Sequence, residues 1–277
     1  MGTTPALEQL APCIGAEVRG VDLRDGRERD LALVREALAR HHVVVIGGQD
    51  LDDVQLHAFA ASFGQVARLP DRYADPGAVP GLYDIDGEEV RVTRWHTDLT
   101  FEPSPSWLGI LAAKIVPELG GDTLWVNMSA AHSRLSPAFA RFLLPLDAEH
   151  TSAGLTIEDG PLRSMVHPVV TARPATGEPV LYVNPLWTQR IVGLEPAESS
   201  GVLTALFEIA TATPEIELRH RWRPGDVVVW DMRSTLHRAV DDYGDRGRVL
   251  RRASVLCERP SRFGGSWADL SAGSSSL

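Results

Sequence analysis

Cysteine and long apolar runs are both scarce in this sequence, and each scarcity excludes a class of protein. The 277 residues include only two cysteines, Cys13 and Cys257, which are too few for a disulfide framework. No apolar run approaches the roughly 20 residues that a membrane-spanning helix needs. The first ten residues also lack the charged and apolar regions of a signal peptide. We therefore expect a cytoplasmic protein with no membrane segment.

Basic residues are outnumbered by acidic ones, and lysine is nearly absent. The 27 Lys and Arg residues against 37 Asp and Glu leave a net charge of −10, and Lys114 is the one lysine. A GC-rich coding genome explains the preference for arginine. Nucleic-acid affinity comes largely from neutralising phosphates, so an acidic chain is not expected to bind nucleic acid.

Composition and periodicity predict one globular domain with a β core. Hydrophobic residues make up 44% and charged residues 23%, which is ordinary for a folded domain. We assign residues 1–263 to a single domain and 264–277 to a small, polar tail that frays. Turns rather than helices separate most of the predicted strands, a pattern typical of an antiparallel β core with helices packed on it. The predicted helices are 29–41, 52–63, 129–144 and 195–211, the predicted strands are 42–46, 107–116, 124–126, 166–171, 180–184, 225–230 and 249–257, and a long loop is expected over 68–89.

The motif WHTD at positions 95–98 is the first chemical signal. In a strand, residues two apart point to the same face, so His96 and Asp98 could direct an imidazole and a carboxylate to one point. This spacing is common by chance, and a solvated strand end is the alternative reading.

His237 follows a predicted strand and is the candidate for a third ligand. Two histidines and one carboxylate form the facial triad of non-heme Fe(II) oxygenases, which leaves three coordination positions open. His167, beside Pro168, is a weaker candidate for supporting a ligand. Structural or surface roles fit better for His41, His42, His57, His132 and His220.

Three arginines lie on or beside the predicted strand 249–257. Arg248 and Arg252 are four residues apart and share a face, whereas Arg251 points the other way. Arginine pairs with carboxylates through two parallel hydrogen bonds, so an inward face would indicate anionic ligands. A basic surface strand paired with the aspartates between 241 and 245 is an equally good reading of the spacing alone.

Several separated segments match one family pattern in the same order along the chain. They are WHTDLTFEPSPSWLGILAAKIVPELGGDTLWVN, HPVVTARPATGEPVLYVN and GDVVVWDMRSTLHRAVDDYGDRGRVLRRASV, preceded by IGAEVRGVDL and HHVVVIGGQDL. Together they resemble the TauD/TfdA family of Fe(II)- and 2-oxoglutarate-dependent dioxygenases. The resemblance implies a double-stranded β-helix, or jelly-roll, core with flanking helices, in the α+β or mainly β class. It also implies hydroxylation of an unactivated C–H bond with O2, releasing succinate and CO2.

The resemblance also assigns roles to individual residues. His96, Asp98 and His237 match the iron ligands. Thr123 and Arg248 match the residues that bind the distal carboxylate of 2-oxoglutarate. Arg252 matches an arginine at the junction of cosubstrate and substrate, where several members of the family bind a sulfonate or carboxylate.

The substrate is implied only as a class. Trp187 falls where the family often places an aromatic residue beside the substrate, and Arg72 and Tyr73 lie in a loop that could help to bind an anion. That loop lacks the histidine with which the family grips taurine, so taurine is not expected. We expect a small anionic substrate instead, which is a sulfonate, a sulfate ester, an aryloxy or other carboxylic acid, or a natural-product intermediate.

Other functions and the oligomeric state stay open at this point. A zinc-dependent jelly-roll hydrolase or isomerase could use the same three ligands, although it would not need Thr123 and Arg248. A catalytically decayed binding protein is the other alternative. Relatives in the family are often dimers or tetramers, so a homodimer or homotetramer is expected.

Overall fold

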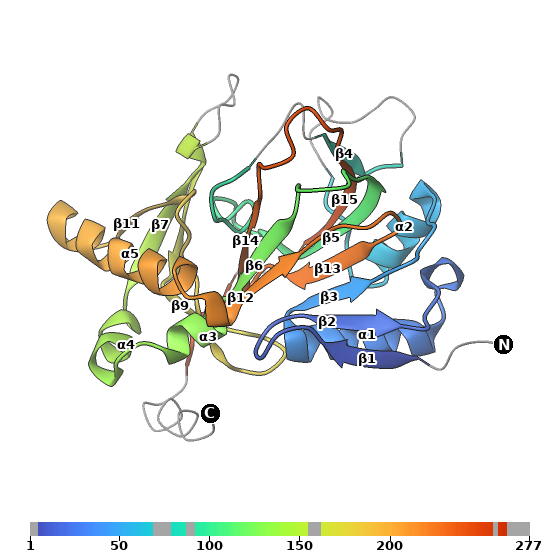
Figure 1. Cartoon of the computed structure of the whole chain (residues 1–277). Coiled ribbons are helices and arrows are strands. Elements are labelled where there is room, and N and C mark those ends of the chain that lie inside the picture. The colour runs from blue at the N-terminus through green and yellow to red at the C-terminus, as the bar shows by residue number, and fades with distance from the viewer. Residues whose placement is uncertain (1–4, 69–78, 87–91, 155–161, 257–259, 265–277) are drawn as a thin grey trace.

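The larger of the two facing sheets has seven strands. The computed structural model describes residues 5–68, 79–86, 92–154, 162–256 and 260–264 (Figure 1). In spatial order the strands are β1 (Ala6–Gln9), β2 (Ala16–Arg19), β3 (Val43–Ile46), β13 (Val227–Asp231), β5 (Ser106–Ile115), β15 (Val249–Leu256) and β4 (Tyr83–Asp86). Every pairing is antiparallel except that of β2 with β3.

Two three-stranded sheets and a hairpin complete the β structure. The first contains β12 (Glu217–His220), β6 (Thr123–Asn127) and β14 (Thr235–Ala239); the second contains β11 (Thr188–Ile191), β7 (Asp147–Thr151) and β8 (Ser164–Pro168); the hairpin joins β9 (Val170–Ala172) to β10 (Pro179–Leu181). The first of these sheets faces the seven-stranded sheet across a core that includes Trp125, Trp222 and Trp230. This is the jelly-roll architecture that the resemblance implies.

Helices cover the outer faces of the sheets. They are α1 (Glu28–His41), α2 (Asp53–Ala61), α3 (Met128–Ser133), α4 (Pro137–Leu143) and α5 (Pro196–Thr211), with short 3-10 turns at Leu23–Asp25, Ser152–Gly154 and Pro214–Ile216. The apolar faces of α1 and α2 pack on the seven-stranded sheet, and α5 packs against β11 and β6 (Figure 1). No helix among the described residues is long and apolar enough to cross a membrane.

Local chemistry sets several of these boundaries. Asp52 caps the start of α2: its Oδ1 accepts from the Gln55 amide at 2.8 Å, and Gln55 Oε1 accepts from the Asp52 amide at 3.0 Å, which is a capping box. The single helix predicted over 129–144 is instead two helices. Its break comes at Ser136, whose hydroxyl caps α4 while Pro137 occupies the first turn, the position where proline is tolerated.

Three further expectations from the sequence were wrong. The predicted loop 68–89 contains the edge strand β4. The single strand predicted over 166–171 is divided between β8, which pairs with β7, and β9, which pairs with β10. The WHTD segment is not a strand, because His96 makes only an isolated bridge and the chain turns at once. The predicted tail lies outside the described residues from 265 onward.

Three buried histidines away from the metal ligands are held neutral by the fold. Burial lowers the pKa of His42 to about 3, of His132 to about 4 and of His150 to about 3; the neighbouring Arg173 also lowers that of His42, and His167 that of His150. In the unfolded chain each would have a pKa near 6.5. The unfolded state therefore binds more protons than the folded state once the pH falls below that value.

We predict that the protein loses stability steeply between about pH 6.5 and pH 4.5. Each of the three histidines should reduce the free energy of unfolding by up to about 1.4 kcal/mol per pH unit as the pH falls. Urea denaturation at several pH values measures this slope. His132→Leu should remove about one histidine's share of this slope, because burial alone lowers the pKa of His132 and no charged neighbour is involved. An unfolding midpoint that is constant across this range would contradict the prediction.

Candidate metal centre

A two-residue bridge joins the segment that carries His96 to the strand that carries His237. The His96 amide donates to the His237 carbonyl at 3.0 Å, and the His237 amide donates back at 2.8 Å. His237 lies on β14, which pairs along its length with β6. The two imidazole rings are therefore neighbours, with centroids 4.2 Å apart. The backbone pairing, rather than alternation within one strand, brings the ligands together.

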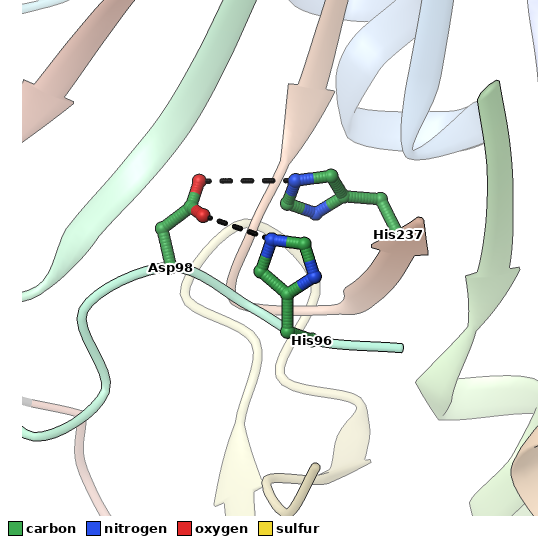
Figure 2. Close-up of side chains that lie close together, drawn as sticks. All are labelled: His96, Asp98 and His237. Carbon is green, nitrogen blue, oxygen red and sulfur yellow. Dashed lines mark ion pairs between the residues drawn. The ribbon is translucent and has the colours of Figure 1, made fainter. Parts of the chain in front are cut away.

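Asp98 directs one carboxylate oxygen to each imidazole (Figure 2). Its Oδ1 lies 3.2 Å from His96 Nε2, and its Oδ2 lies 3.9 Å from His237 Nε2. One nitrogen or oxygen of each residue lies within 4.8 Å of those of the other two. The chain turns directly after Asp98, where Leu99 has a φ of 55°, a left-handed conformation that is uncommon for a residue other than glycine.

The chemistry of the three side chains suits a metal ion. His96 Nδ1 lies 2.9 Å from the Arg94 carbonyl; because a carbonyl only accepts, Nδ1 donates in this contact, and Nε2 is the nitrogen that faces Asp98. Burial, reinforced by His96, lowers the pKa of His237 well below its usual value. Burial opposes ionisation of Asp98, but Arg252 and His237 hold its pKa well below the usual range. Metal ligation needs unprotonated imidazole nitrogens and a carboxylate, and two histidines with one aspartate are a donor set that fits Fe(II).

Arg252 contacts the same carboxylate. Its Nη2 donates to Asp98 Oδ2, its Nε lies 3.3 Å from Ser254 Oγ, and its guanidinium carbon lies 5.1 Å from the centre of the Trp230 ring. The residue is 4% exposed. A buried cation is thus held beside the three candidate ligands.

Arg248 is equally buried, but it contacts neutral groups. Its Nε donates to the Gly121 carbonyl at 2.7 Å, and its Nη2 donates to Thr123 Oγ1 at 3.0 Å. No ion pair reaches Arg248 within the described ranges, and burial lowers its pKa. A buried cation without an anion is costly, so its surroundings suit a carboxylate ligand.

The Thr123 hydroxyl still has its hydrogen available to donate. Its hydroxyl oxygen accepts from Arg248 Nη2 and also from Trp222 Nε1, which lies 3.0 Å away. The hydroxyl hydrogen must therefore go to a third group. The preceding turn brings the two side chains together: Gly121 has a φ of 71°, and a Cβ there would lie 3.0 Å from Arg248 Cδ.

The opposite face of β15 is a separate charge network. Arg251 Nη2 lies 2.6 Å from Asp53 Oδ2, and its Nη1 lies 3.2 Å from Asp84 Oδ1. Arg251 thus points toward α2, away from Arg248 and Arg252, as the period of two predicts. The reading of this strand as a basic surface strand is wrong, because all three arginines are buried.

Trp187 lies in a small apolar cluster that adjoins the ligand loop, the segment that carries His96 and Asp98. Its ring packs edge-on against Phe101 with centroids 5.1 Å apart, and Leu99, Val92 and Leu186 join the cluster. Leu99 directly follows Asp98, so the cluster forms an apolar wall next to the candidate ligands. Arg72 and Tyr73 lie outside the described residues.

Sequence analysis missed two residues at this centre. Trp230 contacts both the His237 ring, with centroids 5.1 Å apart, and the Arg252 guanidinium. Trp222 bonds to Thr123. The available signal was alternation along 225–230, which places Trp230 on the inner face of β13. The contact of Trp222 with Thr123 joins residues about one hundred positions apart and has no local signature.

Comparisons with known proteins agree with this geometry. The sequence profile described as "Taurine catabolism dioxygenase TauD, TfdA family" matches residues 6–254. The chain is 34% identical to the alpha-ketoglutarate-dependent sulfate ester dioxygenase of Pseudomonas putida, over 91% of this chain and 89% of the relative. It is 33% identical to an alkylsulfatase of Acinetobacter baylyi, over 91% and 85%. A solved structure of a taurine dioxygenase from Burkholderia xenovorans superposes with a TM-score of 0.83 at 35% identity, covering 93% of each chain.

We predict that removing one ligand abolishes tight metal binding without unfolding the protein. His237→Ala should weaken binding of Fe(II), or of Co(II) as a probe, by at least about 100-fold, more than the 10- to 100-fold typical of residues that only support a ligand. Anaerobic calorimetric titration measures it. His57→Ala, on α2, is the matched control and should bind metal normally. Wild-type affinity in His237→Ala would remove His237 from the ligand set.

Proposed function

The chain belongs to the TauD/TfdA family and is a non-heme iron, 2-oxoglutarate-dependent dioxygenase; from this premise we propose that its substrate is a small sulfate ester with an apolar chain. Two buried arginines support this: Arg248, beside Thr123, suits the cosubstrate, which leaves Arg252, beside the candidate ligand Asp98, for the substrate. The names of two relatives, an alkylsulfatase and a sulfate ester dioxygenase, favour sulfate over other anions.

His96, Asp98 and His237 would hold the iron and leave one face of the ion open. With Fe(II) and 2-oxoglutarate bound, the centre couples decarboxylation of 2-oxoglutarate by O2 to oxidation of a substrate C–H bond. The chain contributes the orientation of the ligands. Nδ1 of His96 is fixed by the Arg94 carbonyl, and Asp98 is held as a carboxylate by Arg252 and His237.

Thr123 and Arg248 would bind the distal carboxylate of 2-oxoglutarate. The guanidinium supplies a charge-assisted pair, which is roughly twice as strong as a neutral hydrogen bond. The Thr123 hydroxyl, which already accepts from Arg248 and Trp222, supplies a donor of fixed direction. These contacts orient the cosubstrate and do not take part in the oxidation.

Arg252 and Trp187 would bind opposite ends of the substrate. Arg252 lies four residues from Arg248, about 13 Å along an extended strand, so the two cations serve different groups. A planar guanidinium matches the oxygens of a sulfate, while the cluster of Trp187 and Phe101 offers contact for an alkyl chain.

The proposed reaction follows from the position of the oxidised carbon. Hydroxylation at the carbon that bears the sulfate oxygen turns R–CH2–OSO3⁻ into R–CH(OH)–OSO3⁻. This compound loses sulfate as its C–O bond breaks and its hydroxyl proton departs, which leaves the aldehyde R–CHO. One O2 and one 2-oxoglutarate are consumed, and one succinate and one CO2 are released.

We test the assignment of Arg248 against a neighbour on the opposite face of the same strand. Arg248→Ala should raise the KM for 2-oxoglutarate roughly 30- to 1000-fold, because about 2–4 kcal/mol of carboxylate pairing is lost. The KM for the primary substrate should change far less. Arg251→Gln breaks the ion pairs with Asp53 and Asp84 and should lower stability, but it should leave both KM values unchanged. An unaltered cosubstrate KM in Arg248→Ala would contradict the assignment.

The substrate class is tested with compounds of one chain length and different head groups. Hexyl sulfate, hexanesulfonate, hexanoate and hexanol are compared, with taurine, for O2-dependent succinate formation in the presence of Fe(II). Hexyl sulfate should be oxidised fastest and release one sulfate per succinate. Release of sulfate without O2 or 2-oxoglutarate would indicate a hydrolase. Preference for hexanol would contradict an anionic substrate.

Arg252 variants separate substrate binding from cosubstrate binding. Arg252→Gln should lower kcat/KM for hexyl sulfate by at least tenfold and leave most of the slow, substrate-free decarboxylation of 2-oxoglutarate. Arg252→Lys should recover only part, because a point charge does not replace the planar fork. Metal affinity is measured on both variants, since Arg252 also contacts Asp98. Parallel loss of both activities would assign Arg252 to the cosubstrate or the metal instead.

A further inference from the structure

A buried polar network lies beside the metal centre, and no step of the proposed reaction uses it. It consists of Thr100, His150, Asn184, Thr188 and His167, which are at most 7% exposed. Their contacts link three parts of the fold: the ligand loop, the β7–β8 sheet and the turn that follows β10. Buried polar groups are normally hydrogen-bonded; here most of the bonds converge on Thr100 and Asn184, whereas His150 Nε2 has no hydrogen-bond partner among the described residues.

Thr100, two residues after Asp98, is gripped through both its side chain and its backbone. Its Oγ1 lies 2.9 Å from His150 Nδ1 and 3.3 Å from Asn184 Nδ2, and its carbonyl lies 2.9 Å from His167 Nε2. The strand residues that grip it, His150 on β7 and His167 on β8, come from a sheet that carries no candidate ligand. The left-handed backbone of Leu99, between Asp98 and Thr100, needs such restraint from its surroundings.

Asn184 connects this network to the apolar cluster that contains Leu186 and Trp187. Its Oδ1 accepts from the Leu186 amide at 3.1 Å and from the Trp187 amide at 2.9 Å. These bonds fix the orientation of the amide group and turn Nδ2 toward Thr100. The Trp187 carbonyl accepts from the Thr151 amide at 2.9 Å, next to His150 on β7. Trp187 is therefore anchored at both its amide and its carbonyl.

The hydrogen bonds of the network depend on the Thr100 hydroxyl. This group accepts from Asn184 Nδ2 and can give its own hydrogen to His150 Nδ1, because the buried imidazole is neutral. The Thr100 hydroxyl touches both His150 on β7 and the Asn184 side chain. The Thr188 hydroxyl joins the same two residues, because it lies 3.3 Å from His150 Nδ1 and accepts from the Asn184 amide at 2.9 Å. Phe101, the residue after Thr100, packs edge-on against Trp187, so the segment of Thr100 and the segment of Trp187 are also in contact through these two rings.

We propose that Thr100, His150 and Asn184 are positioning residues that fix the Trp187–Phe101 wall relative to the metal ligand Asp98. They touch neither the candidate ligand atoms nor Arg248. Their effect is on where the substrate chain lies when oxidation begins. The inference rests on the proposed function in one respect, which is that Trp187 lines the substrate site.

Thr100→Val removes the hydroxyl at nearly constant volume, and Thr100→Ser keeps it. In Thr100→Val we expect at least tenfold faster hydrogen exchange at the Leu186 and Trp187 amides, although these lie more than 80 residues away in the sequence. Thr100→Ser should stay within about threefold of wild type. Thr211→Val is the matched control, because the Thr211 hydroxyl bonds only to the Phe207 carbonyl within α5, and it should leave both amides unchanged.

A kinetic measurement distinguishes positioning from a general loss of structure. With hexyl sulfate, Thr100→Val should consume at least three 2-oxoglutarate molecules per sulfate released and show a raised substrate KM. Its KM for 2-oxoglutarate and its metal affinity should stay within about threefold of wild type. His150→Asn, which keeps a polar atom near Nδ1, should be less uncoupled than His150→Leu; this pair serves if Thr100→Val does not fold.

Three outcomes would overturn the proposal: unchanged exchange at Leu186 and Trp187 in Thr100→Val, unchanged coupling, or equal damage in Thr100→Ser. Hydrogen exchange needs no substrate, so it tests the network even if no sulfate ester is oxidised. Failure of the wild-type enzyme on every head group would instead count against the proposed function.

Discussion

The arrangement of this site depends on the carboxylate of Asp98, which two imidazoles and one guanidinium share. His96 lies on the same short segment, His237 comes from β14 and Arg252 from β15. β14 and β15 belong to the two facing sheets of the jelly roll, so a single carboxylate joins both layers. In a partly buried position, an ionised carboxylate requires these partners, and the partners in turn require the carboxylate. The charge balance of the centre and the packing of the two sheets therefore constrain each other.

Three neighbouring arginines show how one strand can serve different purposes. Arg248 contacts a carbonyl and a hydroxyl, Arg251 pairs with two aspartates near α2, and Arg252 contacts the ligand carboxylate. The alternation of side chains along β15 sends Arg251 to the outer face and leaves two cations inside. Of the two inner arginines, Arg248 makes no ion pair among the described residues and directs its hydrogen bonds to neutral groups, which is why we propose it as the partner of the dicarboxylate cosubstrate.

Sequence patterns predicted what depends on short-range order. The facing of Arg248 and Arg252 and the WHTD and His237 motifs are readable within a few residues. The bridge between His96 and His237 is not, because it joins residues 141 positions apart, and the strand alternation expected at WHTD is not what brings His96 and Asp98 together. Short strands such as β4, in a Pro- and Gly-rich stretch, have no periodicity to detect. His150 gave no signal, since its role exists only through Thr100 and Thr188.

The most direct test of the account is anaerobic visible spectroscopy of the wild-type protein with Fe(II) and 2-oxoglutarate. A cosubstrate that chelates iron on the open face of the triad gives a metal-to-ligand charge-transfer band, which should appear only when both are added. The band should shift when hexyl sulfate is added, because the substrate lies beside the metal. Fe(II) binding without any such band, at saturating 2-oxoglutarate, would contradict the claim that His96, Asp98, His237 and Arg248 form one site.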